Sequence, residues 1–405
     1  MNKYLLLLLA FFVAACSNNN NKEQIIDEIE FVPEMLGLTP GSSIAEVNFT
    51  WYSNNGENSF VRVFENGKIV STETGKYGEA SSGKYSHKAT AKNLKPNTEY
   101  TYRVSNDNRK WSAEYKYKTP NPKTFKFAAV GDPQLNAREQ TPASNWFSPD
   151  SSTALGWKIT VGKIAAAKAD FILSLGDQVD SGSDEKEYED LFAPPELRSI
   201  PLAPTLGNHD RYQFLHYHFN LPNEQDFSEN YCNYFYLYNN ILFVALNTSA
   251  YFSSAEATKP YIENFDSTLA AAKAMYSGKY KWLIVQHHKS TRSVAGHSEE
   301  NDIKSYIEAG FETLMEKYNV DFVLAGHDHV YANIKLGNIY YMTLTTASGI
   351  KYYEAKEPLP TNTYAQQSKR PGYTIFKVND NGISVSVYEV YDDKDKIIDK
   401  FEVTK

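Results

Sequence analysis

Five short polar motifs hold the residues of this chain that are best suited to chemistry. They are rich in aspartate, asparagine and histidine, and each follows a short apolar run. In chain order they are Gly131-Asp132-Pro133-Gln134, Gly176-Asp177-Gln178-Val179-Asp180, Gly207-Asn208-His209-Asp210, Gln286-His287-His288 and Gly326-His327-Asp328-His329. Side chains of these types are oxygen and nitrogen donors for divalent metals such as Zn, Mn or Fe, and no thiolate is among them. The motifs therefore predict a metal centre.

Buried strands are the elements that would position these motifs. The run Phe127-Ala128-Ala129-Val130 and its counterparts end in glycine or turn residues, which is typical of buried strands. Residues 153–168 show helical spacing between the first two of these strands, so they predict a βαβ unit and a partly parallel sheet. Ligands gather at the carboxyl ends of strands in α/β sheets, and we expect the five motifs to meet there.

The ordered set of motifs resembles the calcineurin-like metallophosphoesterases and, within them, the purple acid phosphatase branch. The resemblance implies an α/β fold, a four-layer αββα sandwich, over residues 123–405. It also implies a metal-dependent phosphoric ester hydrolase, in which a hydroxide bridging two divalent ions (Mn, Zn or Fe) attacks a phosphate-ester substrate.

The resemblance also assigns roles to individual residues. Asp177 is expected to bridge both ions, because a shared carboxylate holds two dications about 3.5–4 Å apart, as two-metal hydrolysis requires. The first ion takes Asp132 and His329, and the second takes Asn208, His288 and His327. His209 is expected to stabilise charge or protonate the leaving group, with Asp210 orienting its ring.

The choice between His287 and His288 depends on the residues that follow them. His288-Lys289 resembles a pattern in bacterial relatives where the ligand histidine precedes a lysine, and a second histidine follows nine residues later. This register makes His288 the ligand and His297 a contact to phosphate. His287 would face the other side of the strand and serve a structural role.

Two positions depart from the family pattern. Asp180 stands where the purple branch has a metal-binding tyrosine, and Gln134 stands where other metallophosphoesterases have a metal-binding histidine. The Gln134 amide oxygen and the Asp180 carboxylate are therefore candidates for the missing ligand of the first ion. Without the tyrosine, we expect a colourless protein.

The segment before the α/β domain has the pattern of an all-β sandwich at residues 31–119. Residues 46–51 and 59–64 alternate polar and apolar side chains, which gives each strand one buried face. The Leu-x-Pro-x-Thr-x-Tyr-x-Tyr pattern of residues 94–102 resembles a fibronectin type III-like sandwich and the N-terminal domain of purple acid phosphatases.

The chain begins with the features of a targeting signal. Lys3 precedes an apolar run that is too short to span a bilayer, and Val13-Ala14-Ala15-Cys16 resembles a bacterial lipobox. We expect a signal peptide at 1–15, lipidation of Cys16, and a polar tether at 16–30 that holds the protein on a membrane of the bacterial cell envelope, facing the periplasm or the exterior. An ordinary secretory signal with an incidental cysteine is the alternative.

Further along the chain, the pattern predicts several elements of the α/β domain. Residues 136–152 form a polar stretch that we expect to be a loop over the site, and 302–318 predict one amphipathic helix. Residues 234–247 predict two strands that are joined at Asn239-Asn240. Strands at 339–348, 373–378 and 383–391 are expected to complete the second sheet.

Composition narrows the partners and leaves two alternative functions open. The net charge of -8 in 405 residues leaves no basic stripe, so binding to a nucleic-acid backbone is not expected. One alternative is a phosphodiesterase that acts on nucleotides or lipid head groups. The other is a binding lipoprotein with a vestigial metal site, against which the intact set of ligands argues.

The lipobox interpretation predicts that Cys16→Ser blocks lipidation, because the thiol that would carry the lipid is gone. The variant should leave the membrane fraction, whereas the wild type should stay there after a salt wash. Fractionation followed by immunoblotting measures this, and a variant that is still membrane-bound after the wash contradicts the interpretation.

Overall fold

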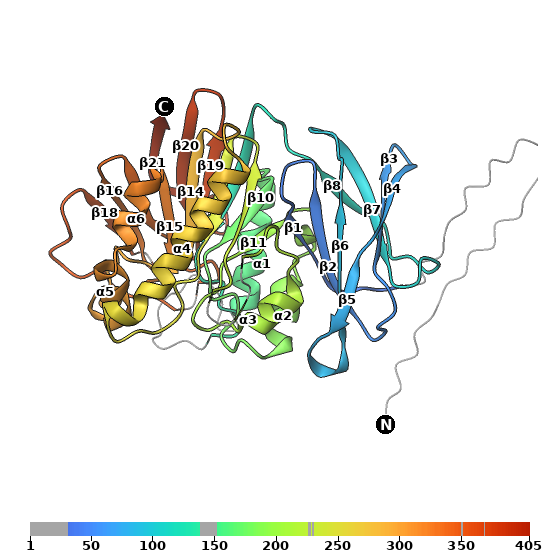
Figure 1. Cartoon of the computed structure of the whole chain (residues 1–405), viewed down its shortest axis with the longest axis horizontal. Helices are drawn as coiled ribbons and strands as arrows, with labels where there is room; N and C mark the ends of the chain where they lie inside the picture. Colours follow the sequence, from blue (N-terminus) through green and yellow to red (C-terminus); the bar gives the residue numbers. More distant parts are fainter. Residues whose placement is uncertain (1–30, 138–151, 226–227, 229–230, 350, 368) are drawn as a thin grey trace, which may run out of the picture.

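The computed structural model describes residues 31–137, 152–225, 228, 231–349, 351–367 and 369–405. An all-β domain at the N-terminal side packs beside a larger α/β domain (Figure 1). Cys16, the signal peptide, the tether and most of the loop predicted at 136–152 lie outside the described residues. Within the part that is described, no helix has the length and apolar character needed to cross a bilayer.

The N-terminal domain consists of two four-stranded antiparallel sheets, which confirms the predicted all-β architecture. Trp51, Val61 and Tyr102 are buried between the sheets in the core of this domain. In sheet order the strands are β1 (Glu34–Pro40), β2 (Val47–Ser53), β6 (Tyr85–Ala91) and β5 (Lys76–Glu79), then β4 (Lys68–Thr74), β3 (Phe60–Glu65), β7 (Glu99–Ser105) and β8 (Tyr115–Lys118).

The α/β domain contains a six-stranded and a seven-stranded sheet. The first has the order β11 (Leu202–Pro204), β10 (Phe171–Ser174), β9 (Phe125–Val130), β19 (Gly372–Val378), β20 (Gly382–Glu389) and β21 (Lys396–Thr404). The second has the order β12 (Tyr234–Tyr238), β13 (Ile241–Ala245), β14 (Trp282–Lys289), β15 (Phe322–Gly326), β17 (Ile339–Thr343), β16 (Tyr331–Leu336) and β18 (Thr363–Gln366). Strands β9, β10 and β11 are parallel, as are β13, β14 and β15.

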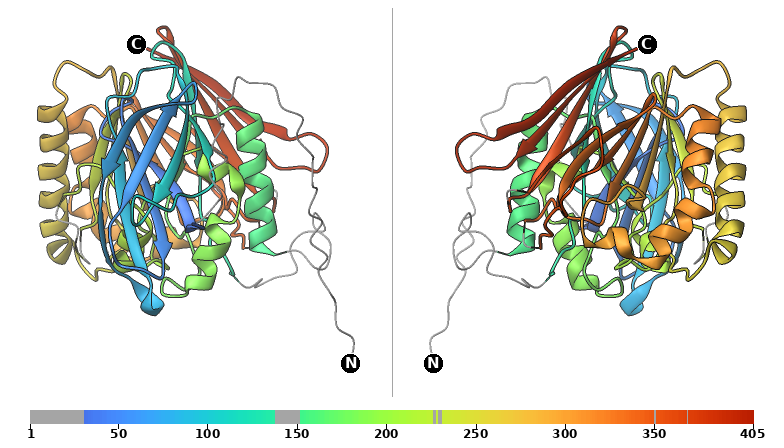
Figure 2. Two further views of the ribbon diagram at one scale, coloured as in Figure 1. Left: turned by 90° about the vertical axis from the view of Figure 1, so that its right-hand side faces the viewer. Right: turned by 90° about the vertical axis from the view of Figure 1, so that its left-hand side faces the viewer.

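Helices cover the outer faces of both sheets. On the side of the first sheet lie α1 (Thr153–Ala166) and α2 (Glu185–Phe192), and on the side of the second lie α4 (Ala255–Met275), α5 (Asn301–Glu308) and α6 (Phe311–Tyr318). Figure 2 shows α1 and α4 on opposite sides of the paired sheets. The short helix α3 (Tyr212–His218) follows the third polar motif. This arrangement confirms the predicted four-layer αββα sandwich.

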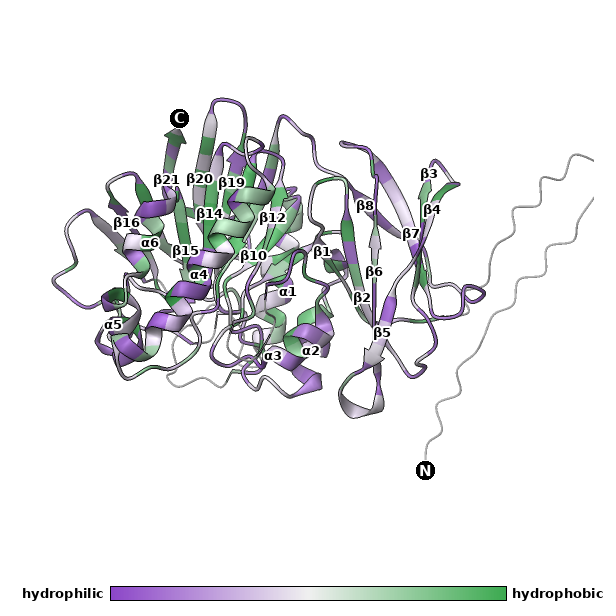
Figure 3. Ribbon diagram, viewed as in Figure 1, coloured by the Kyte–Doolittle hydropathy of each residue, from purple (hydrophilic) through white to green (hydrophobic). Residues whose placement is uncertain are grey.

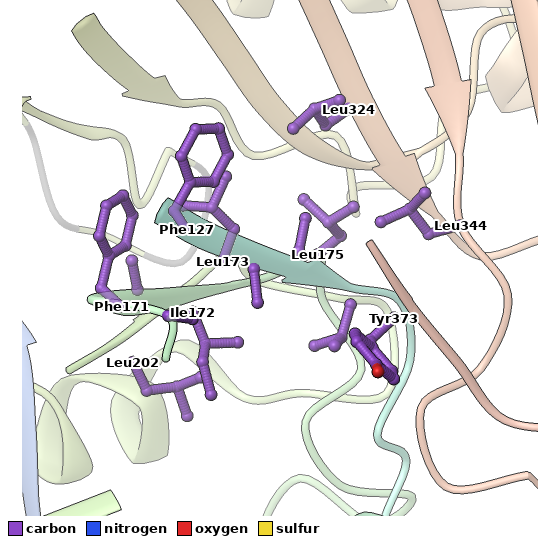
Figure 4. Packing of buried hydrophobic residues seen from close by; sticks show 14 of the residues in the cluster. Phe127, Phe171, Ile172, Leu173, Leu175, Leu202, Leu324, Leu344 and Tyr373 are labelled. Atoms are coloured by element: carbon purple, nitrogen blue, oxygen red, sulfur yellow. The ribbon is translucent and has the colours of Figure 1, made fainter. Parts of the chain in front are cut away.

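Aromatic side chains fill the space between the two sheets. Phe127 stacks on Phe376 of its own sheet with ring centroids 4.5 Å apart, and it meets Phe243 of the other sheet edge-on at 5.2 Å. Figure 4 shows Phe127 and Leu173 in the same packed layer as Leu324 from the second sheet. Figure 3 shows hydrophobic residues along the strands of both sheets. This packing fixes the strand ends that carry the polar motifs.

Two predicted details of the α/β domain are wrong, and one is confirmed. Of the three strands predicted to complete the second sheet, only β17 belongs to it. Strands β19 and β20 belong to the first sheet, where β19 pairs antiparallel with β9. The helix predicted at 302–318 is two helices, because the chain takes a left-handed conformation at Gly310 with φ 102°. The paired strands predicted at 234–247 are present as β12 and β13.

A buried polar cluster joins the two domains. Tyr52 of β2 stacks on His218 of α3 with ring centroids 4.5 Å apart. The ring of Tyr188 also stacks on His218, with the centroids 4.2 Å apart. His218 Nε2 lies 2.9 Å from a carboxylate oxygen of Glu185, and the Tyr52 hydroxyl donates to the other oxygen at 3.3 Å. Burial lowers the pKa of His218 although the Glu185 carboxylate opposes this shift.

This cluster makes stability depend on pH in one direction. His218 takes up a proton less readily in the folded protein than in the unfolded chain, where it is protonated below about pH 6.5. Its contribution is therefore present above that pH and is lost as the pH falls. His218→Gln should lower the free energy of unfolding at pH 7.5 by about 1–3 kcal/mol. Between pH 7.5 and pH 5.5, the free energy of unfolding should fall less in this variant than in the wild type. Denaturant unfolding at both pH values measures this, and an unchanged loss contradicts it.

Candidate metal centre

The polar motifs meet at the carboxyl ends of parallel strands from both sheets. Asp132, Asp177 and Asn208 follow β9, β10 and β11, while His288 lies at the end of β14 and His327 follows β15. Asp132, Asp177 and His327 have φ angles of 38°, 46° and 72°. Residues other than glycine rarely adopt this left-handed conformation, and such residues gather at functional sites. The backbone thus turns sharply where β9, β10 and β15 deliver their side chains.

Two motif glycines let the backbone approach the carboxylates closely. A Cβ atom at Gly207 would lie 2.1 Å from Asp177 Oδ1, and one at Gly326 would lie 2.6 Å from Asp132 Oδ2. Any larger residue would therefore push a carboxylate away. The glycines of these motifs are required by the space around the site.

The carboxylates of Asp132 and Asp177 are both buried and both lie near imidazoles. Asp132 accepts hydrogen bonds from the His327 backbone N–H at 2.9 and 3.0 Å, and its Oδ1 lies 3.5 Å from His329 Nε2. Asp177 Oδ1 accepts from the His209 backbone N–H at 2.9 Å and lies 3.3 Å from His288 Nε2. Negative charge is therefore concentrated where the two sheets meet.

His288 lies between these groups. Its Nδ1 donates to the Leu175 carbonyl at 2.8 Å, and its Nε2 lies 3.0 Å from Asn208 Oδ1. Burial lowers the pKa of His288, but the charge and hydrogen bond of Asp177, together with the charge of Asp132 and the Leu175 carbonyl, outweigh this and raise the pKa to about 9. A proton on Nε2 thus stands among the oxygens of Asp177 and Asn208. A metal ion bound by these atoms would replace that proton.

His287 faces a different environment from that of His288. Its ring packs against Phe311 of α6 at 4.9 Å, and its Nδ1 lies 3.3 Å from the Thr248 hydroxyl. Burial lowers its pKa to about 3, and the charge of His288 adds to this effect. His287 therefore lies in the packing beneath helix α6, while His288 lies beside the carboxylates.

The donor set fits a dication. Single donor atoms of Asp177, His288 and His327 all lie within 4.8 Å of one another. His327 Nε2 is buried, and within the described residues it has no hydrogen-bond partner. Burial, together with the charge of His288, lowers the pKa of His327 well below its usual value, so the ring is neutral and its free nitrogen can bind a metal. Asn208 adds an oxygen to this cluster.

Asp132 and His329 form the other half of the site, together with Gln134. His329 Nδ1 donates to the Lys351 carbonyl at 2.7 Å, which leaves Nε2 toward Asp132. Gln134 Nε2 donates to Asp180 Oδ1 at 2.9 Å. Its Oε1 is buried and has no hydrogen-bond partner in the described part of the chain. The orientation of the amide therefore leaves the Gln134 oxygen available as a ligand, while Asp180 holds the amide.

The prediction that Asp210 orients the His209 ring is wrong. The Asp210 carboxylate accepts from the backbone N–H groups of Gly207 at 2.8 Å and Gln178 at 2.9 Å, because the two motif turns lie side by side. The His209 ring is instead held by Asp180, whose carbonyl accepts from Nδ1 at 2.8 Å and whose Oδ1 lies 3.4 Å away. Asp210 thus joins the turn of Asp177 to that of Asn208.

His297 lies beside the cluster, and an aspartate that the sequence analysis did not single out holds it. Its ring centroid is 4.1 Å from that of His327, and its Nδ1 donates to Asp328 Oδ1 at 3.0 Å. The other oxygen of Asp328 accepts from the Val294 backbone N–H at 3.2 Å. A buried acid between two histidines of one tetrapeptide is the signal that could have identified Asp328.

A cavity of about 550 Å³ opens over the centre. The predicted residues Asp177, Asn208, His209, His297, His327 and His329 line it. The sequence analysis missed Glu300, Lys351 and Tyr353 in its wall, which come from turns outside the motifs. Lys289 also lines the cavity, but its ammonium group pairs with Asp302. Substrate would therefore meet imidazoles, carboxylates and Lys351.

Comparison with known proteins agrees with this geometry. The calcineurin-like phosphoesterase family matches residues 125–331, and the purple acid phosphatase N-terminal domain matches residues 33–119. No curated protein matches the chain.

Several solved structures are similar to this chain, and the first one described here shares its fold. A purple acid phosphatase from yellow lupin (Lupinus luteus) seeds superposes with a TM-score of 0.69 and 18% identity, covering 92% of this chain and 74% of that chain. GAP50, the anchor in the inner membrane complex of Plasmodium, has a TM-score of 0.49 and 18% identity over 70% of this chain and 89% of that chain. A dimetal phosphatase from Danio rerio has a TM-score of 0.45 and 12% identity over 69% of this chain and 98% of that chain.

The family match covers the strands that carry Asp132, Asp177, Asn208, His288 and His327. Phosphoesterases of this kind use a dinuclear metal centre. This chain therefore belongs to the calcineurin-like phosphoesterase family, with a purple acid phosphatase N-terminal domain preceding its α/β core.

Proposed function

We propose that this protein hydrolyses phosphate esters at a centre of two divalent ions, in the manner of acid phosphatases. The observation that carries the proposal is that two buried carboxylates and five imidazole and amide groups lie together beneath a polar cavity, at the edge where the two sheets meet. Asp132, Asp177 and His329 would hold the first ion, with the free Gln134 oxygen as its further ligand. Asp177 would also hold the second, together with Asn208, His288 and His327.

The ions would supply an activated water and polarise the phosphoryl oxygens. The chain itself provides the geometry for the remaining work. His288 reaches the site only in one ring orientation, because Nδ1 is fixed on the Leu175 carbonyl at 2.8 Å. His329 is fixed in the same way on the Lys351 carbonyl at 2.7 Å. These backbone acceptors set the tautomer that leaves Nε2 free as a ligand.

His209 is placed to move a proton. Its Nδ1 is held by the Asp180 carbonyl, and the ring lines the cavity beside Asp177 and Asn208. In its charged form, Nε2–H would donate to the oxygen of the leaving alcohol as the bond to phosphorus breaks. The Asp180 carboxylate also lies 3.4 Å from Nδ1. On the other side, His297 would hold a phosphoryl oxygen, since Asp328 fixes its Nδ1.

We also propose that the protein works at the cell envelope, anchored to a membrane through lipidated Cys16. The lipobox-like sequence at Val13–Cys16 and the polar residues after it support this placement. A tether of this kind would leave the cavity accessible to phosphate esters outside the cytoplasm.

A panel of aryl phosphate mono- and diesters, assayed with added Mn, Zn or Fe(II), tests the proposed function. The wild type should hydrolyse them in a metal-dependent way, and faster turnover of diesters would favour a phosphodiesterase. Asp177→Asn should abolish hydrolysis because the shared carboxylate is lost. His209→Ala should keep its metal, as measured by elemental analysis, yet lose about 10²-fold or more in kcat.

A remote variant serves as the control. Arg109→Gln changes an exposed residue of the N-terminal domain and should behave as the wild type. Unchanged kcat in His209→Ala would remove His209 from the mechanism. If the metal-loaded wild type hydrolyses none of the esters in the panel, the result would favour a binding lipoprotein with a vestigial metal site.

A further inference from the structure

A second cavity of about 650 Å³ adjoins the metal centre. Asn208, a predicted ligand, lines both cavities, so the two meet at the site itself. The walls of the second cavity come from the turn at 206–210, from helix α3 and from residues 247–250 after β13. A group attached to a phosphate at the metal centre could therefore extend into this space.

Helix α3 gives this cavity an aromatic wall. Arg211, Phe214 and Tyr217 follow one another at spacings of three residues and so lie along one side of the helix. Phe214 meets Tyr217 edge-on at 5.7 Å and stacks against Tyr188 at 6.0 Å. Tyr188 is buried, so the rings are supported from the protein interior. Tyr212 adds a further ring to the lining.

The same wall carries an available positive charge. Arg211 is exposed, and its guanidinium forms no ion pair or hydrogen bond with any residue that the structure describes. Asp210 is the acidic residue in the lining, but its two oxygens accept from backbone N–H groups, and it forms no ion pair with Arg211 among the described residues. A guanidinium binds carboxylate or phosphate in a bidentate manner and also stacks on flat rings.

We propose that this cavity, lined by Arg211, Phe214 and Tyr217, binds the alcohol portion of the substrate, and that this portion is a flat ring bearing a second anionic group. The inference rests on the proposed function, because it requires a phosphate at the metal centre. The phosphate would lie in the first cavity, near His209 and His297. The ester oxygen would pass Asn208, and the ring would pack on the aromatic wall with its anionic group at Arg211.

Binding of two phosphonates, which cannot be hydrolysed, tests this subsite in the full-length, metal-supplemented protein. Isothermal titration calorimetry would compare benzylphosphonate with 4-carboxybenzylphosphonate. The carboxylate should tighten binding to the wild type about tenfold or more, as expected for a charge-assisted hydrogen bond. In Arg211→Gln the ratio of the two dissociation constants should fall to near one, and Arg211→Lys should restore part of it. Cyclohexylmethylphosphonate should bind more weakly than benzylphosphonate.

The control is Arg109→Gln, which removes the same charge from the N-terminal domain and should keep the wild-type ratio. An equal ratio in the wild type and Arg211→Gln would overturn the proposal, as would absence of binding by the wild type. Hydrolysis of phenyl phosphate is measured separately. If phenyl phosphate is hydrolysed but the carboxylate does not tighten phosphonate binding, the proposed subsite is wrong and the proposed function stands. If it fails while the phosphonate ratio holds, the binding subsite stands and the hydrolytic function is wrong.

Discussion

Two buried carboxylates impose the main constraint on this structure. Asp132 and Asp177 are buried at the seam between the sheets, and a buried charge without a partner is strongly destabilising. Burial lowers the pKa of His288, but Asp177, Asp132 and the Leu175 carbonyl together raise it to about 9, which keeps a proton beside the carboxylates. One imidazolium neutralises only part of this negative charge. The site therefore keeps negative charge that a bound cation would offset.

The surrounding scaffold makes such a concentration of charge possible. Parallel strands from both sheets end at the same edge, so ligands distant in sequence arrive together. Left-handed residues turn the chain sharply after β9, β10 and β15, and Gly207 and Gly326 leave room for the carboxylates. Asp210 ties two of these turns by accepting three backbone hydrogen bonds. Its pKa is raised to about 7 by burial and by Asp177, so the ties weaken if a metal-free protein is acidified.

Much of the fold was predictable from local pattern, and the exceptions have physical causes. The strand ends, the βαβ unit and the all-β N-terminal domain were predicted from hydrophobic periodicity, which is a pattern among residues close together in the sequence. The return of β19 to the first sheet depends on long-range pairing with β9, which no local pattern encodes. The break at Gly310 was visible as a glycine, but an isolated glycine does not always end a helix.

The candidate site shows the same division. Residue type and motif order were enough to bring Asp132, Asp177, Asn208 and His288 together as candidates. The partners that orient them were not predictable in this way. The Asp180 carbonyl that holds His209 is a backbone atom, and the function of Asp210 depends on two turns lying side by side. The cavity wall beyond Asn208 likewise depends on how α3 packs.

Anomalous diffraction from crystals grown with Mn is the most direct test of the central claim that Asp177 is shared by two ions. The account predicts two anomalous peaks, with Asp177 in contact with both. One should also contact Asp132 and His329, and the other Asn208, His288 and His327. A single peak, or two peaks of which Asp177 contacts only one, would contradict it.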